Sequence, residues 1–214
     1  MSEWCVNSYF VEKEEIEKSF GSKNQRLIEQ VLEDRDEIIS DFNENGFADE
    51  DFEKGISIEV AIEDLINGNI KNVFPFKNSI ATWAIVATIS KSRPINSTIG
   101  YPFLRLSDFT EIIKEGGKFP NLLDVLESLD GQNSKYDLPI NMKEWGDMPR
   151  ISYIESVSDD LVLEINEMKK DFEDEADWLF DFDEDPEDIE QILDWLLEAK
   201  NKSKSICLIM DGDL

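Results

Sequence analysis

The chain has 214 residues, of which 41% are hydrophobic and 10% aromatic, and this is enough for a folded core. Its 49 acidic and 21 basic residues give a formal net charge of −28, which excludes nucleic acid and anionic membranes as expected partners and favours a basic protein. Histidine is absent, which excludes Ser-His-Asp and Cys-His nucleophile pairs and the common histidine-containing zinc and haem sites.

The first third of the chain predicts a strand followed by two helices. Residues 3–11 are rich in β-branched and aromatic residues without helical spacing, which is typical of a strand. The apolar residues of segment 23–40 form an imperfect helical stripe, which predicts one amphipathic helix. The next helix has Ser57 as its N-cap and Gly68 as its C-cap. Its apolar residues recur at helical spacing: Ile58, Ala61, Ile62, Leu65 and Ile66.

The middle of the chain predicts three further helices. Residues 79–94 are apolar nearly all round, which indicates a helix buried on most of its circumference. A loop over residues 96–103 leads to a short helix that Ser107 caps. The third of these helices begins at Pro120 and ends at Gly131.

The last third predicts a long connection and then alternating strands and helices. Residues 132–150 lack periodicity, which indicates a long surface connection. A short strand at residues 150–154 precedes a helix that Ser158 caps. The final helix begins at Pro186, and residues 206–210 predict the last strand.

Strands at both ends with helices between them predict an α+β fold. We expect one helix-rich domain over residues 1–214, with a small sheet that involves the N- and C-terminal strands. The sheet strands lie near residues 3–11, 150–154 and 205–210. Because such short strands are not stable alone, we expect them to pack against the apolar helix around residues 83–89.

The stretch that begins at Asp41 has the spacing of the first half of an EF-hand calcium loop. Its position 12 is Phe52, where a bidentate glutamate is needed, so the strongest ligand is missing. The same residue pattern also occurs where one helix ends and the next begins. An ordinary turn between two helices is therefore the alternative to a calcium loop. The candidate calcium ligands are Asp41, Asn43, Asn45 and Asp49. No other cofactor is expected.

A second acidic stretch, residues 171–190, holds 12 carboxylates among its 20 residues and no lysine or arginine. One interpretation is a solvated face whose aromatic residues pack inward. The other is an acidic surface with an aromatic anchor for a basic partner. The candidate partner-binding residues are Asp171, Glu173, Asp174, Glu175, Asp177, Trp178, Asp181, Asp183 and Asp185.

Two cysteines, Cys5 and Cys207, stand near the two ends of the chain and outside any CxxC pair. Without histidine to activate either thiol, we expect inert, buried cysteines, although pairing of the terminal strands would bring them towards each other. The N-terminus lacks the pattern of a signal peptide, and no apolar run reaches the ~18 residues needed to span a bilayer. We therefore expect a cytoplasmic protein.

Three segments give the chain a layout similar to that of known proteins. WCVNSYFVEKEEIEKSFGSKN near the start, IGYPFLRLSDFTEII in the middle and LLEAKNKSKSICLIMDGDL at the end resemble the bacterial YfbM-like proteins and related domains of unknown function. The resemblance implies a bacterial cytosolic α+β domain with a first strand, a helical middle and a last strand. It assigns no functional residues.

The expected function is that of a non-catalytic acidic protein that binds a basic protein, as an immunity protein does. No nucleophile-base pair, cofactor motif or metal set is legible in the sequence, so catalysis is the less favoured class. An enzyme built on paired carboxylates, with an unknown substrate, is the alternative. A weak calcium-binding protein is a further, minor alternative.

Overall fold

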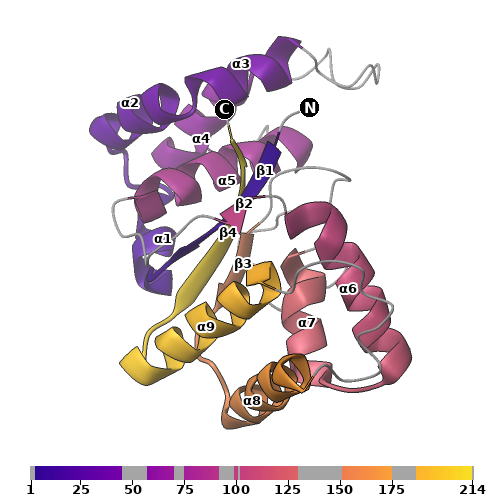
Figure 1. Cartoon of the computed structure of the whole chain (residues 1–214). Coiled ribbons are helices and arrows are strands. Elements are labelled where there is room, and N and C mark those ends of the chain that lie inside the picture. Colours follow the sequence, from indigo (N-terminus) through magenta and orange to yellow (C-terminus); the bar gives the residue numbers. More distant parts are fainter. Residues whose placement is uncertain are drawn as a thin grey trace.

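The two ends of the chain form adjacent strands of one antiparallel sheet. In the computed structural model, β1 (Glu3–Tyr9) pairs with β4 (Ile206–Asp213) along its whole length. β3 (Ile151–Ile154) extends the sheet beyond β4, and the strand order is β2-β1-β4-β3. The predicted α+β class, with a small sheet from both ends of the chain, is confirmed (Figure 1). The structure describes residues 3–44, 57–69, 75–91, 99–100, 102–129, 151–174 and 187–213.

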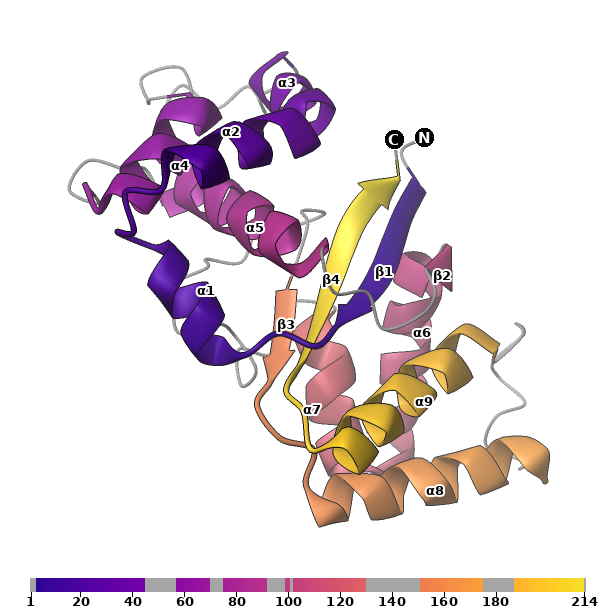
Figure 2. The same ribbon diagram turned by 90° about the vertical axis from the view of Figure 1, so that its left-hand side faces the viewer.

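The helices lie in two groups, one on each face of the sheet (Figure 2). The first group consists of α1 (Lys13–Ser19), α2 (Gln25–Asp34), α3 (Asp36–Glu44), α4 (Ile58–Asn67) and α5 (Pro75–Lys91). The second group consists of α6 (Pro102–Gly116), α7 (Pro120–Leu129), α8 (Asp159–Glu173) and α9 (Glu187–Lys202).

The residues of β4 alternate between these two helical layers. Ile206 and Leu208 belong to the hydrophobic cluster that α6 to α9 form, whereas Cys207 and Ile209 belong to the cluster of α1 to α5. Successive side chains of a strand point to opposite faces, so a continuous apolar run suits a strand that is covered on both faces. The predicted packing of the sheet against the apolar helix around Trp83 is therefore found on one face, and α6 to α9 cover the other.

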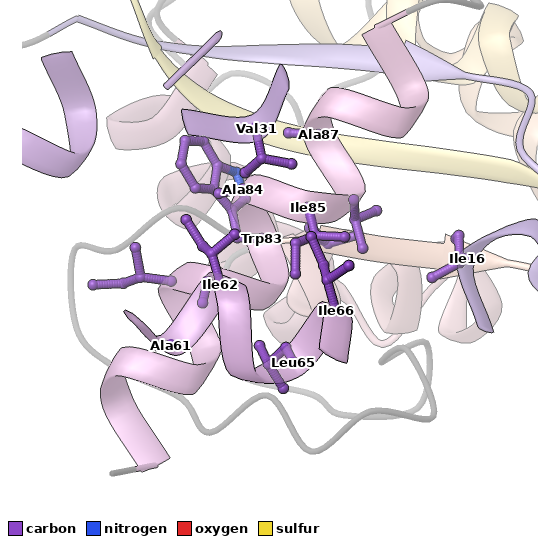
Figure 3. Packing of buried hydrophobic residues seen from close by; sticks show 14 of the residues in the cluster. Ile16, Val31, Ala61, Ile62, Leu65, Ile66, Trp83, Ala84, Ile85 and Ala87 are labelled. Atoms are coloured by element: carbon purple, nitrogen blue, oxygen red, sulfur yellow. The ribbon is translucent and has the colours of Figure 1, made fainter. Parts of the chain in front are cut away.

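The helix pair α4 and α5 forms the centre of the first cluster (Figure 3). The Val60 backbone N–H donates to Ser57 Oγ at 3.4 Å, and Gly68 ends α4 with a left-handed φ of 79°. Both predicted caps and the five-residue apolar stripe of α4 are thus confirmed. In α5 every residue from Ile80 to Thr88 is buried, as the all-round apolar pattern predicts.

The single helix predicted over residues 23–40 is wrong, because the chain breaks it into α2 and α3 at Arg35. Arg35 leaves the helical region with φ −124° and ψ 14°. Its buried guanidinium lies over the Trp83 ring, 5.1 Å from the ring centroid. On the two sides of this break, α2 and α3 each contact α4.

Two predictions for the middle of the chain also need correction. α6 begins at Pro102, so Ser107 lies inside the helix and is not its cap. Proline suits the first helical position because its fixed φ matches the helix and its missing N–H would have no partner there. Ile99 and Gly100, predicted as loop, form the short strand β2 opposite Val6 and Cys5 of β1. Two residues are too few to show strand periodicity.

The predicted starts of α7 and α8 are confirmed, whereas β1 ends at Tyr9 instead of residue 11 and β4 continues to Asp213 beyond the predicted residue 210. α7 begins at Pro120, and Ser158 caps α8 by accepting a hydrogen bond from the Leu161 backbone N–H at 3.1 Å. The predicted connection over residues 132–150 lies outside the described residues, as do Gly131 and Pro186.

Candidate functional site

One side of α8 is an acidic surface with a leucine in it. Leu161, Ile165 and Met168 point into the core, so the opposite side of the helix faces solvent. There Asp160, Leu163 and Glu167 follow one another at intervals of three and four residues, which places them on one stripe. Leu163 is 67% exposed. We call the exposed residues of this side the α8 outer face: Asp159, Asp160, Leu163, Asn166, Glu167, Lys170, Glu173 and Asp174.

Two exposed acids of α8, Asp159 and Asp174, are paired within the protein. Asp159 accepts from Lys200 Nζ at 2.6 Å, and this hydrogen bond lowers the pKa of the Asp159 carboxyl. Asp174 lies 4.0 Å from Lys170. Within the described part of the chain, Asp160, Glu167 and Glu173 form no ion pair. The α8 outer face therefore keeps an excess of negative charge.

Two acids of α8 stabilise the fold directly. The Glu164 carboxylate accepts from Asn121 Nδ2 at 2.6 Å and from the Leu122 backbone N–H at 2.8 Å, and so it caps the first turn of α7. Asp171 pairs with Lys118 at 3.3 Å, and the next residue, Phe172, stacks on the Phe109 ring of α6. The Asp171 ion pair thus connects α8 with the turn between α6 and α7.

The predicted partner-binding segment is only partly described. Asp171 has the structural contact above, whereas Glu173 and Asp174 are exposed on the α8 outer face. A partner-binding role for these three residues stays a prediction. The other candidates lie outside the described residues: Glu175, Asp177, Trp178, Asp181, Asp183 and Asp185.

The calcium candidates fall at the edge of the described residues. Asp41 and Asn43 belong to α3, whereas Asn45 and Asp49 lie outside the described part. Among the described residues, no group of three or more Cys, Asp or Glu side chains is arranged to hold a metal ion. The calcium hypothesis stays a prediction.

Strand pairing does not place the two cysteines opposite each other. Cys5 pairs with Asp211 and Cys207 pairs with Tyr9, so four strand residues, about 13 Å, separate the two positions along the sheet. A disulfide needs Cα atoms within ~7 Å. Cys207 is a free, buried thiol, and burial strongly raises its pKa. The prediction of a buried, inert cysteine is confirmed for the burial of Cys207.

A groove of about 550 Å³ opens between α1 and the adjoining ends of β3 and β4. Sequence reasoning missed it, because its lining comes from three segments that are far apart in the chain. We call it the α1 groove and define it by its lining residues: Glu12, Lys13, Glu14, Glu15, Glu17, Lys18, Tyr153, Glu155 and Ser205. Five carboxylates face two ammonium groups there, so the groove favours a positively charged ligand.

Three ion pairs hold the rim of the α1 groove. Glu14 pairs with Lys18 at 2.9 Å, which lowers the pKa of the Glu14 carboxyl and raises that of the Lys18 ammonium group. Lys13 lies 4.0 Å from Glu17. Across the groove, Lys204 reaches Glu12 at 3.4 Å. Because these pairs are exposed, they orient the side chains but add little stability.

Comparison with known proteins assigns no relative: no protein-family model, no curated protein and no solved structure matches the chain. Among the helices that the structure describes, none has the length and apolar character needed to cross a membrane.

Proposed function

We propose that the chain is a non-catalytic, cytoplasmic binding protein that neutralises or regulates a basic protein, as an immunity protein does with a toxin. The observation that carries the proposal is the α8 outer face, where Asp160 and Glu167 lie on either side of the exposed Leu163 and Glu173 adds a further carboxylate at the end of the helix. The chain continues from this face into residues 175–185, which add six carboxylates in eleven positions.

Charge supports a basic partner. The net charge of −28 attracts a positively charged protein from a distance, and the unpaired acids of α8 concentrate that attraction. Such steering raises the association rate and is screened beyond a Debye length of ~8 Å at physiological ionic strength. We therefore expect association to be fast at low salt and to slow steeply as salt is added.

Leu163 is the proposed apolar anchor that would slow dissociation of the partner. Charged rim contacts mostly change the association rate, whereas a buried apolar anchor slows dissociation. An exposed leucine with carboxylates on either side fits a partner that has an apolar pocket rimmed by lysine or arginine. Trp178, in the acidic segment that follows, is the second proposed anchor.

The test is recovery of a partner by the full-length protein from its native host at low and at high salt. A basic protein that binds only at low salt is expected. Chemical cross-linking with mass spectrometry should then place this protein on α8 or on residues 175–185. With the purified partner, Asp160→Asn with Glu167→Gln should slow association at least about tenfold at low salt, since two steering charges are lost.

A matched control has the same charge change elsewhere. Glu29→Gln with Glu33→Gln neutralises two exposed acids of α2 and should leave association nearly unchanged. A variant with Asp181→Asn, Asp183→Asn and Asp185→Asn tests the following segment. Equal association rates for the α8 variant, the segment variant and the α2 control would show that the acids serve only solubility.

A further inference from the structure

A buried tyrosine hydroxyl without a hydrogen-bond partner lies at the base of the α1 groove. Tyr153 is only 6% exposed, and its Oη has no hydrogen-bond partner among the described residues. The Ser205 hydroxyl and the Lys13 backbone N–H approach it, but Ser205 donates to the Glu155 carbonyl oxygen at 3.1 Å. Tyr153, Lys13 and Ser205 all line the groove.

Glu155 also lines the α1 groove. It follows β3 directly and is two residues from Tyr153. Glu155 is exposed and makes no ion pair within the described residues. The groove is thus lined by a carboxylate that has no ion pair among the described residues and by a tyrosine whose buried hydroxyl has no hydrogen-bond partner among them.

We propose that the α1 groove binds a guanidinium group, which donates to Tyr153 Oη and to the Glu155 carboxylate together. A guanidinium is planar and has five N–H donors in a fixed fork, so it can reach two acceptors at once. An ammonium group is a compact, strongly hydrated charge and fits this pair of acceptors less well. The α1 glutamates add the negative field that draws the cation in.

The site is separate from the α8 outer face, and the proposal stands whether or not that face binds a protein. Two kinds of ligand carry a guanidinium group: a protein with an arginine side chain, and a free guanidinium compound. NMR titration of the full-length, ¹⁵N-labelled protein tests both sources. One arm uses agmatine, and the other uses a neutral-flanked peptide with a single arginine. A peptide with lysine in place of that arginine is the control ligand.

The expected result is a saturable shift of the Lys13, Glu155 and Ser205 amide signals. Tighter binding of the arginine peptide than of agmatine would identify a protein side chain as the ligand, and the reverse would identify a free guanidinium compound. Loss of one charge-assisted hydrogen bond in Tyr153→Phe should weaken binding about tenfold. Glu155→Gln should do the same, whereas Glu29→Gln on α2 should not.

Three results would overturn the proposal. The first is no shift at these amides with either guanidinium ligand. The second is equal affinity for the lysine and arginine peptides, which would show simple charge attraction. The third is unchanged affinity in both Tyr153→Phe and Glu155→Gln, with amide spectra showing that each variant is folded.

Discussion

Gly68 at the end of α4 lies against Gly21 in the connection between α1 and α2. A Cβ on Gly68 would lie only 3.3 Å from the Gly21 Cα, and both residues have left-handed φ angles, 79° and 71°. The same connection donates hydrogen bonds from Gly21 N–H to the Leu65 carbonyl oxygen at 3.0 Å and from Lys23 N–H to that of Ile66 at 2.9 Å. The end of α4 therefore fixes where α2 begins.

Gly68→Ala should destabilise the protein by about 2–3 kcal/mol, because a left-handed alanine costs about 1–2 kcal/mol and the Cβ also crowds Gly21. Gly117→Ala is the matched control, since Gly117 has φ 62° but open space around its Cα. Urea unfolding measures both. The difference between the two variants gives the cost of the close approach, and equal costs would mean that backbone strain alone matters.

Arg35→Lys should lower the free energy of unfolding by about 1–2 kcal/mol, because lysine keeps the charge but loses the planar stacking on Trp83 in a desolvated place. Arg26→Lys, at an exposed position of α2, should change stability by less than about 0.5 kcal/mol. Chemical unfolding followed by circular dichroism compares them. Similar small changes in unfolding free energy at both positions would show that the stacking of Arg35 on Trp83 adds no stability.

Ser128 on α7 and Ser152 on β3 share a buried hydrogen bond, with 2.9 Å between their hydroxyl oxygens. Removing one hydroxyl leaves the other buried without this partner, so Ser128→Ala should cost about 1–3 kcal/mol. The double variant Ser128→Ala with Ser152→Ala should cost less than the sum of the single variants. A double-mutant cycle measures this coupling, and strict additivity would argue against the bond.

Cys207 should make stability fall at alkaline pH. Its pKa is raised in the folded protein by burial, whereas an unfolded thiol titrates near ~8.5. The folded state therefore keeps the proton that the unfolded state releases, and stability is lost as pH rises above the unfolded value, by about 1.4 kcal/mol per pH unit. In a Cys5→Ser background, Cys207→Ala should remove this slope between pH 9 and 10. Equal pH dependence of the unfolding free energy with and without Cys207→Ala would contradict the assignment of this slope to Cys207.

Calcium binding through Asp41, Asn43, Asn45 and Asp49 should be no tighter than the millimolar range, because Phe52 replaces the bidentate ligand. Titration calorimetry at millimolar calcium measures it. Asp41→Ala should abolish the heat, and Asp36→Ala in the first turn of α3 is the control. Heat that survives Asp41→Ala would remove the hypothesis.

The sequence predicts only some of the exposed acids of α8. The density of carboxylates in the sequence points to Glu173 and Asp174, and both are exposed. Asp160, Leu163 and Glu167 were missed, although helical spacing counted from the Ser158 cap would have put Leu163 on the polar side. The α1 groove had no sequence signal, because Tyr153 and Glu155 meet α1 only after β3 has paired with β4.

The sequence by itself determined the elements whose causes are local. Ser57 and Ser158 cap helices whose apolar stripes follow within a few residues, and Pro120 begins α7 where its ring fits the first turn. Interactions of this kind involve neighbours within about four positions, so the chain order already contains them.

Only the tertiary structure decided the rest. The helix break at Arg35 coincides with a contact between its guanidinium and the ring of Trp83, 48 positions later. Ile99 and Gly100 form a strand because they pair with β1. The apolar run of β4 did not reveal that its residues alternate between two helical layers. In each case the stabilising partner is distant in sequence, and burial and strand pairing depend on what the folded chain brings alongside.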